Sequence, residues 1–109
     1  MLLSQAIRKG SEQTKQVHGQ LFLRVQGEIQ GACAIGLAYL AIFGPPTLEE
    51  LCHNEFIYGK MDDLGWNKLS TGSCPAEGCN YRHPDGVHLN DNHLWTAEQI
   101  ADWYEANGL

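Results

Sequence analysis

An uncharged stretch, Gly31–Phe43 (GACAIGLAYLAIF), constrains the fold of this chain more than any other segment. Its composition predicts a helix that is apolar on every face. Such a helix either lies at the centre of a domain or spans a membrane, and a span needs about 20 residues. Ala32–Phe43 has only 12 residues, so we expect a buried central helix there. Gly44, Pro45 and Pro46 would end it, because glycine accepts the left-handed cap conformation and proline cannot continue a helix.

A β-hairpin is predicted immediately before the central helix. Leu21–Val25 is rich in strand-forming residues, Gln26-Gly27 is typical of a tight turn, and Glu28–Gln30 could form a short returning strand. The preceding segment, Ser11–Gln20, is polar and weakly patterned, which favours a loop or a frayed continuation of the first helix. The sequence therefore predicts a short hairpin or three-stranded sheet that leads directly into the buried helix.

Three further helices are predicted from capping residues and apolar spacing. Ser4 would cap the first, which would end at Gly10, and capping boxes that begin at Thr47 and Thr96 would open the other two. The expected ranges are Gln5–Lys9, about 48–57 and about 97–106.

The segment 58–86 is predicted to be one long irregular loop, because it contains five glycines and two prolines. A loop of this length is usually functional or fixed by a bound group. Val87–Leu89 could form one short strand after it. We therefore expect a single α+β domain over residues 1–109, in which a hairpin or three-stranded sheet packs on three to four helices around the central helix, residues 32–43.

The charge distribution restricts the partners. The net charge is −6, and no Lys or Arg follows Arg82. Nucleic-acid binding depends on basic patches, so we expect no DNA or RNA partner. The short length of the apolar stretch, in turn, predicts no membrane span. The acidic surface could meet a basic partner or only keep the protein soluble. A chain of 109 residues buries only about two-thirds of its unfolded surface, so a homo-oligomer or a bound metal would add useful stability.

The four cysteines bear on the cellular compartment. They occur in a chain whose first residues, Met1-Leu2-Leu3, are followed at once by the polar Ser4 and Gln5 rather than by an apolar export signal. We therefore expect a reducing, cytoplasmic setting with free thiols rather than a disulfide scaffold.

A candidate zinc site comes from Cys74, Cys79, His83 and His88, which fall within fifteen residues. Two thiolates and two imidazoles can complete a tetrahedral zinc site. The spacing is more compact than that of the standard zinc finger, in which about twelve residues separate the cysteine pair from the histidine pair. Structural zinc would order a loop that has little core of its own. The alternative is two loop cysteines near two surface histidines.

A second candidate site is the segment before the last helix. Its ligand-binding candidates are His88, Asn90, Asp91, His93 and Trp95, of which both histidines and Asp91 could also act in acid–base chemistry or as metal ligands. The alternative is structural, because Asn and Asp satisfy backbone donors in turns and a large apolar residue before a helix cap can fix the entry of the chain. The residue types favour the structural role.

The remaining cysteines, Cys33 and Cys52, are predicted to pack rather than to react, because each lies on an expected apolar surface. The sequence contains no glycine-rich phosphate loop, no GxSxG elbow and no HExxH motif. Enzymatic activity is therefore less expected than binding.

Three segments resemble a family of short, largely uncharacterised proteins of tailed phages and bacteria. The similar residues are Leu3–Arg8, the ACAIG motif at Ala32–Gly36 and the C-terminal HLND-x-H-x-WT-x-E-x-IADW pattern at His88–Trp103. The resemblance implies a small intracellular accessory protein encoded by a phage. It carries over no catalytic residues.

Three functional hypotheses follow. The first is a non-enzymatic binding module, such as a phage anti-defence protein that blocks a host protein or sequesters a small ligand, for example a signalling nucleotide. The second is a zinc-stabilised protein-interaction domain that uses the candidate zinc ligands. The third is a small hydrolase that uses His88, Asp91 and His93.

Overall fold

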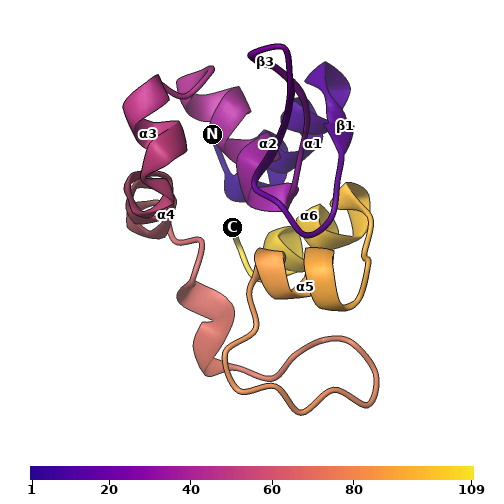
Figure 1. The fold of residues 1–109 in the computed structure, drawn as a ribbon. Coiled ribbons are helices and arrows are strands. Elements are labelled where there is room, and N and C mark those ends of the chain that lie inside the picture. Colours follow the sequence, from indigo (N-terminus) through magenta and orange to yellow (C-terminus); the bar gives the residue numbers. More distant parts are fainter.

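Six α-helices and a short 3₁₀ helix accompany a three-stranded sheet in the computed structural model, which describes residues 1–109 (Figure 1). The predicted α+β class is confirmed, and the prediction of a short sheet is confirmed with it. In chain order the elements are α1 (Leu3–Gln13), β1 (Lys15–Gln16), β2 (Phe22–Val25), β3 (Glu28–Ala32), α2 (Ala34–Phe43), α3 (Leu48–Cys52), α4 (Asn54–Asp63), η1 (Lys68–Thr71), α5 (Gly86–Asn92) and α6 (Ala97–Ala106).

Helix α2 is the predicted buried helix. It begins at Ala34 rather than at Ala32, because Ala32 ends strand β3 and Cys33 occupies the N-cap position. The first six residues of α2 are buried, including Ile35 and Leu37, which expose none of their surface. Gly44 ends the helix with a φ of +79°, as predicted. None of the helices combines the length and apolarity that crossing a membrane would require.

Helix α1 is longer than predicted, and the expected caps were wrong. Leu2 rather than Ser4 is the N-cap residue, and Ser4 is buried inside the helix. Gly10 does not end the helix, because it is the point at which α1 crosses α2. A Cβ atom at Gly10 would lie 2.0 Å from the backbone oxygen of Leu37. The glycine is therefore needed for close approach of two helices and not for a turn.

The predicted hairpin is confirmed. Strands β2 and β3 pair antiparallel, and Gln26 and Gly27 form the turn with φ values of +54° and +81°. Positive φ at both central positions is typical of the tight hairpin turn whose twist matches that of the strands. The third strand, β1, pairs parallel with β3 and makes the sheet order β1-β3-β2. No strand was predicted at β1, because two residues are too few to show the alternation of apolar and polar side chains that is typical of a strand.

The helix predicted at 48–57 is two helices, α3 and α4, separated at His53. The capping box of Thr47 and Glu50 is confirmed, with the Glu50 amide donating to Thr47 Oγ1 at 3.1 Å. The break changes the direction of the chain, so Cys52 is exposed and its predicted packing role was wrong. Helix α4 then continues to Asp63, so the irregular loop is shorter than predicted and covers residues 64–85.

Both ends of this irregular loop, residues 64–85, are anchored on α6. Trp66 is buried and lies against Tyr104, with ring centroids 5.0 Å apart. The Tyr104 hydroxyl donates to the Trp66 carbonyl at 2.7 Å and accepts the Gly86 amide at 3.0 Å. Between these anchors the loop extends away from the helices, below α5 in Figure 1.

Helix α5 replaces the strand predicted at Val87–Leu89. Asp85 is its N-cap, and the Asp85 side chain accepts the His88 amide at 2.9 Å. The three residues Val87–Leu89, of mixed polarity, are compatible with either a strand or one turn of helix. The Asp85 cap therefore determines that they form a helix. The last helix, α6, is confirmed with its capping box, in which the Gln99 amide donates to Thr96 Oγ1.

Candidate metal centre

Two cysteines of the irregular loop and two histidines of the α5 region converge. The ligand atoms of Cys74, Cys79, His88 and His93 all lie within 4.8 Å of one another, and we call these four residues the Cys/His cluster. Cys74 Sγ is 3.6 Å from His93 Nε2, and Cys79 Sγ is 3.5 Å from His88 Nε2. The two Nε2 atoms are 3.1 Å apart. Cys74 is buried and the other three residues are half-buried.

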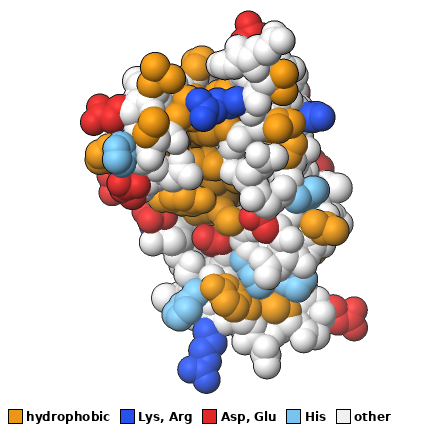
Figure 2. Space-filling view, viewed as in Figure 1, with side chains coloured by type: hydrophobic (Ala, Val, Ile, Leu, Met, Phe, Trp, Pro, Cys, Tyr) orange, Lys and Arg blue, Asp and Glu red, His pale blue; other side chains and the backbone are white.

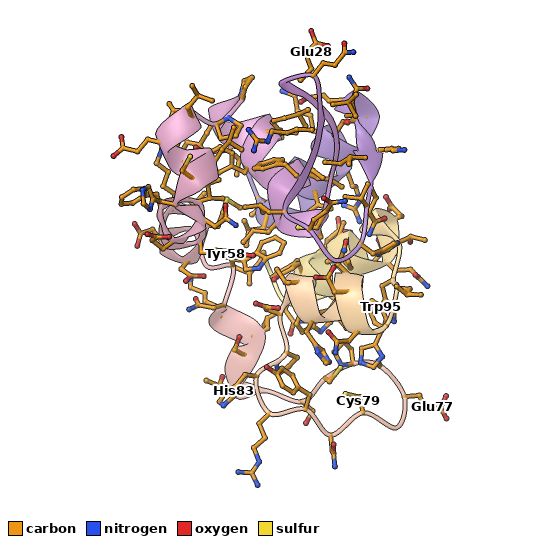
Figure 3. All side chains as sticks on the ribbon, in the orientation of Figure 1. Glu28, Tyr58, Glu77, Cys79, His83 and Trp95 are labelled. Carbon is orange, nitrogen blue, oxygen red and sulfur yellow. The ribbon has the colours of Figure 1, made fainter.

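The structure brings together three of the four predicted metal ligands and adds His93. The fourth predicted ligand, His83, is exposed and contacts Tyr81 edge-on rather than the cluster. In Figure 3, Cys79 lies on the loop beneath α5, and His83 lies on the side of the loop nearer to η1. The sequence predicted His93 as a possible metal ligand of the second candidate site but did not group it with the two cysteines, because it predicted a strand at His88. On a helix that begins at the Asp85 cap, both rings can face the same point.

The loop positions its two cysteines through a tight turn. The Cys79 amide donates to the Ala76 carbonyl at 3.2 Å, and Gly78 has a φ of +79°, a conformation that favours glycine. Burial raises the pKa of the Cys74 thiol, and a hydrogen bond from the Ala76 backbone opposes this increase. The same backbone contact would stabilise a thiolate bound to a metal.

Helix α5 positions the histidines. The Tyr81 ring stacks on His88 with centroids 4.3 Å apart and an interplanar angle of 17°. His88 and His93 meet almost perpendicularly, at 83°. Burial, and then the neighbouring His93, lower the pKa of His88. A neutral imidazole is the form that binds a metal, so the site favours coordination at neutral pH.

The cluster fits a tetrahedral zinc ion. A Zn²⁺ with Zn–S bonds of about 2.3 Å and Zn–N bonds of about 2.0–2.1 Å holds sulfur and nitrogen ligands about 3.5 Å apart and two nitrogens about 3.3 Å apart. Three of the six separations, the S–N pairs at 3.6 and 3.5 Å and the N–N pair at 3.1 Å, are close to these values, and the other three pairs lie within 4.8 Å. Two soft sulfur and two imidazole ligands are also the donor types that zinc prefers.

Asn90 has a structural role at the junction of three elements. It is fully buried, and its Oδ1 accepts the Ala34 amide at 3.0 Å and the Gln16 Nε2 at 2.7 Å. Its Nδ2 donates to the Val17 carbonyl at 3.0 Å. Since the N-cap residue Cys33 makes no side-chain cap, Asn90 satisfies the first amide of α2 from outside that helix.

The other candidate ligand residues lie outside the Cys/His cluster. Asp91 Oδ1 accepts the Gly19 amide at 2.9 Å and Asn90 Nδ2 at 2.7 Å. Trp95 is half-buried against the core, and its carbonyl accepts Gln16 Nε2 at 2.9 Å. The hydrolase hypothesis combines Asp91 with His88 and His93; the two histidines belong to the Cys/His cluster, whereas Asp91 does not.

Cys33 is buried, in agreement with its predicted packing role. It exposes 2 % of its surface, and burial raises the pKa of its thiol to about 11. A thiol with a raised pKa is a poor nucleophile, because only the thiolate reacts. Cys33 therefore contributes to packing at the start of α2.

Comparisons with known proteins assign no family to the chain. No protein-family model, curated protein or solved structure matches it. The resemblance to short phage proteins stays a prediction.

Proposed function

We propose that this protein is a non-enzymatic binding module whose irregular loop is organised by one structural Zn²⁺ ion on Cys74, Cys79, His88 and His93. The observation that carries the proposal is the convergence of four metal-ligating side chains within 4.8 Å, in which two S–N separations and the N–N separation are close to the edges of a zinc tetrahedron. This joins the first two hypotheses, with His93 in place of His83 among the zinc ligands.

A structural rather than a catalytic role is supported by the number of ligands. Catalytic zinc usually has three protein ligands and keeps a fourth position open for water or substrate. Here four side chains of suitable type surround one point, and Cys74 is buried. A zinc ion held by all four would have no open position.

The bound ion would crosslink the irregular loop and α5. Cys74 and Cys79 belong to the irregular loop, whereas His88 belongs to α5 and His93 to the end of that helix. The loop contributes few buried side chains between Trp66 and Gly86, so apolar packing holds it weakly. Zinc would supply the missing crosslink, and its binding energy would order the loop.

The wider role remains the one that the resemblance suggests. We propose a small accessory protein, encoded by a phage, that binds a host protein or sequesters a small ligand. The acidic composition, with a net charge of −6, supports a basic or zwitterionic partner rather than a nucleic acid.

Native mass spectrometry of the protein purified from cells tests the zinc assignment. We expect one zinc ion per chain in the natural protein, and loss of zinc in Cys79→Ser and His93→Ala. Two matched controls, Cys52→Ser and His83→Ala, should keep the metal, because Cys52 and His83 are exposed and lie outside the cluster.

Two results would contradict the proposal. One is less than about half an equivalent of zinc in the natural protein. The other is loss of zinc in His83→Ala together with its retention in His93→Ala, which would restore the ligand set predicted from the sequence.

A further inference from the structure

A hollow separate from the Cys/His cluster opens between the β-hairpin, helices α3 and α4, and helix α5. Its volume is about 410 Å³, which is within the range of small-molecule sites. Figure 2 shows it near the middle of the face, with a hydrophobic floor, a basic side chain above it and acidic side chains below it. Neither zinc-ligand histidine lines it.

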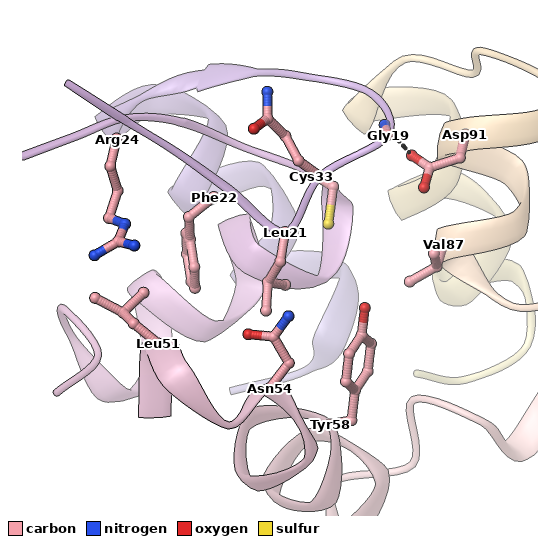
Figure 4. A pocket seen from close by; sticks show the side chains of 11 residues that line it. Gly19, Leu21, Phe22, Arg24, Cys33, Leu51, Asn54, Tyr58, Val87 and Asp91 are labelled. Atoms are coloured by element: carbon pink, nitrogen blue, oxygen red, sulfur yellow. Dashed lines mark hydrogen bonds between the residues drawn. The ribbon is translucent and has the colours of Figure 1, made fainter. Parts of the chain in front are cut away.

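Opposite charges lie at the two ends of the hollow. Figure 4 shows Arg24 at one end, beside Phe22 and Leu51, and Asp91 at the other end, beyond Val87. Arg24 takes part in none of the ion pairs of the structure. Its guanidinium is therefore available to a ligand, and a planar guanidinium is suited to a carboxylate.

Asp91 has one carboxylate oxygen available. Both of its hydrogen bonds, from the Gly19 amide and from Asn90 Nδ2, go to Oδ1. These bonds fix the carboxylate, and in Figure 4 the second oxygen points away from Gly19. A positioned carboxylate with a free oxygen can accept hydrogen bonds from an ammonium group.

The wall between the two charges mixes apolar side chains with polar groups, and most of the surface exposed to the hollow is polar. Leu21 and Phe22 are buried, and the half-buried Tyr58 directs its hydroxyl toward the middle of the hollow in Figure 4. The Asn54 amide lies beside it. The hollow therefore combines apolar side chains with two hydrogen-bonding side chains, as small-molecule sites do.

We propose that this hollow binds a peptide of two or three residues that carries an apolar side chain. Its C-terminal carboxylate pairs with Arg24, its N-terminal ammonium pairs with Asp91, and its apolar side chain lies against the half-buried Leu51 beside Arg24. This inference rests on the proposed function as a binding module and names the ligand class.

The charge pattern disfavours the signalling nucleotide considered above. A phosphate ligand needs several cationic or backbone donors, whereas the hollow offers one arginine and one opposing carboxylate. An α-amino acid carries its two charges on one carbon atom, so it would not reach both ends. A short peptide with free termini satisfies both charged ends and the apolar part of the wall.

The test is an NMR titration of the isotope-labelled, zinc-loaded protein with three probes. Leucyl-leucine carries both charges, its N-acetyl form lacks the ammonium, and its C-terminal amide lacks the carboxylate. We expect saturable shifts at the amides of the hollow, and binding weaker by about tenfold or more for each blocked probe. Equal binding of all three probes, no saturable shift, or tighter binding of AMP would overturn the inference.

Variants of Arg24 and Asp91 test which end of the hollow binds which terminus of the peptide. Arg24→Gln should weaken leucyl-leucine and leave the amide probe unaffected, whereas Asp91→Asn should weaken leucyl-leucine and leave the acetyl probe unaffected. Arg82→Gln is the matched control, because Arg82 is exposed and outside the hollow. Zinc measured on the same samples separates the two proposals: bound zinc without peptide binding contradicts only this inference, and peptide binding without zinc contradicts only the metal centre.

Discussion

The helical half of the molecule and the irregular loop are stabilised by different kinds of interaction. Helices α1, α2 and α6 bury a continuous apolar core, in which Ala6, Ile7, Ile35 and Ile100 expose none of their surface. The irregular loop, residues 64–85, has most of its residues exposed between the buried Trp66 and Pro84. Between those two residues it meets α5 through the Cys/His cluster and through the Tyr81 ring stacked on His88.

The difference shows how a small chain can extend a fold beyond its core. Apolar burial stabilises a segment only where enough surface can be covered. A segment without such surface needs crosslinks between a few side chains, and a metal ion supplies four at one point. Asn90 links the two halves indirectly: it belongs to α5, which carries His88 of the Cys/His cluster, and it bonds to Ala34 of α2 and to Gln16 of β1. Changes to the core should therefore affect both halves, whereas loss of metal should affect mainly the loop.

The largest expected effect is a loss of stability in the helical half, where α1 crosses α2. Gly10→Ala should lower the free energy of unfolding by about 3 kcal/mol or more, because its Cβ would lie 2.0 Å from the Leu37 oxygen. The matched control is Gly59→Ala in α4, where a Cβ meets no atom within 4 Å. The control should stabilise the protein by about 0.5–1 kcal/mol. Denaturant titration of both variants measures the difference, and equal effects would contradict the close helix crossing.

The next effect is at the junction. Asn90→Ala should lower the free energy of unfolding by about 2–3 kcal/mol, because it leaves the buried Ala34 amide without its partner. Asn92→Ala, an exposed position on the same helix, should change it by less than about 0.5 kcal/mol. Thermal unfolding followed by circular dichroism compares the two. A loss at Asn90 no larger than that at Asn92 would show that the two halves are not joined there.

Removal of metal should act locally and more weakly. A chelator should increase hydrogen exchange in the irregular loop by about tenfold or more and leave the amides of α2 protected. The reason is that the core and the Asn90 junction need no metal. Uniform loss of protection in both halves would show that the core depends on the metal, and no change anywhere would show that the metal does not hold the loop.

The smallest expected effect is on the stability of the helical half at acid pH. Lys60, then Tyr39, then the Thr47 amide hold the pKa of Glu50 near 2, below its ordinary value of 4.5. A lowered folded-state pKa means that the ion pair stabilises the protein above pH 4.5 and that this contribution is lost as the pH falls toward 2. Glu50→Gln should reduce the acid sensitivity of metal-free protein in this range, whereas Glu49→Gln should not. Equal pH profiles would contradict the role of the pair.

Sequence patterns predicted the parts of the fold that depend on local signals. The hairpin turn at Gln26-Gly27 and the capping boxes at Thr47 and Thr96 involve residues within a few positions of one another, and all three were confirmed. The buried helix was predicted from composition alone. Its start was misplaced because its first amide is bonded by Asn90, which is 56 positions away in the chain.

The predictions were wrong where contacts between residues far apart in the chain determine the structure. Gly10 appeared to be a helix stop, but the crossing with Leu37 requires it. His83 appeared to be a zinc ligand because it follows Cys79 closely, whereas His93 occupies that place in space. Asp85 was the sequence signal that could have placed His93 near His88, because an aspartate at this position can cap a helix that carries His88 and ends at His93. The hollow between Arg24 and Asp91 had no sequence signal, because its walls come from three separate parts of the chain.

The metal centre can be tested directly by X-ray absorption spectroscopy at the zinc edge of the purified protein. We expect two sulfur ligands at about 2.3 Å and two nitrogen ligands at about 2.0–2.1 Å, unchanged in His83→Ala and disrupted in His93→Ala. A shell of oxygen and nitrogen alone, or a shell that His93→Ala leaves intact, would contradict a zinc ion held by Cys74, Cys79, His88 and His93.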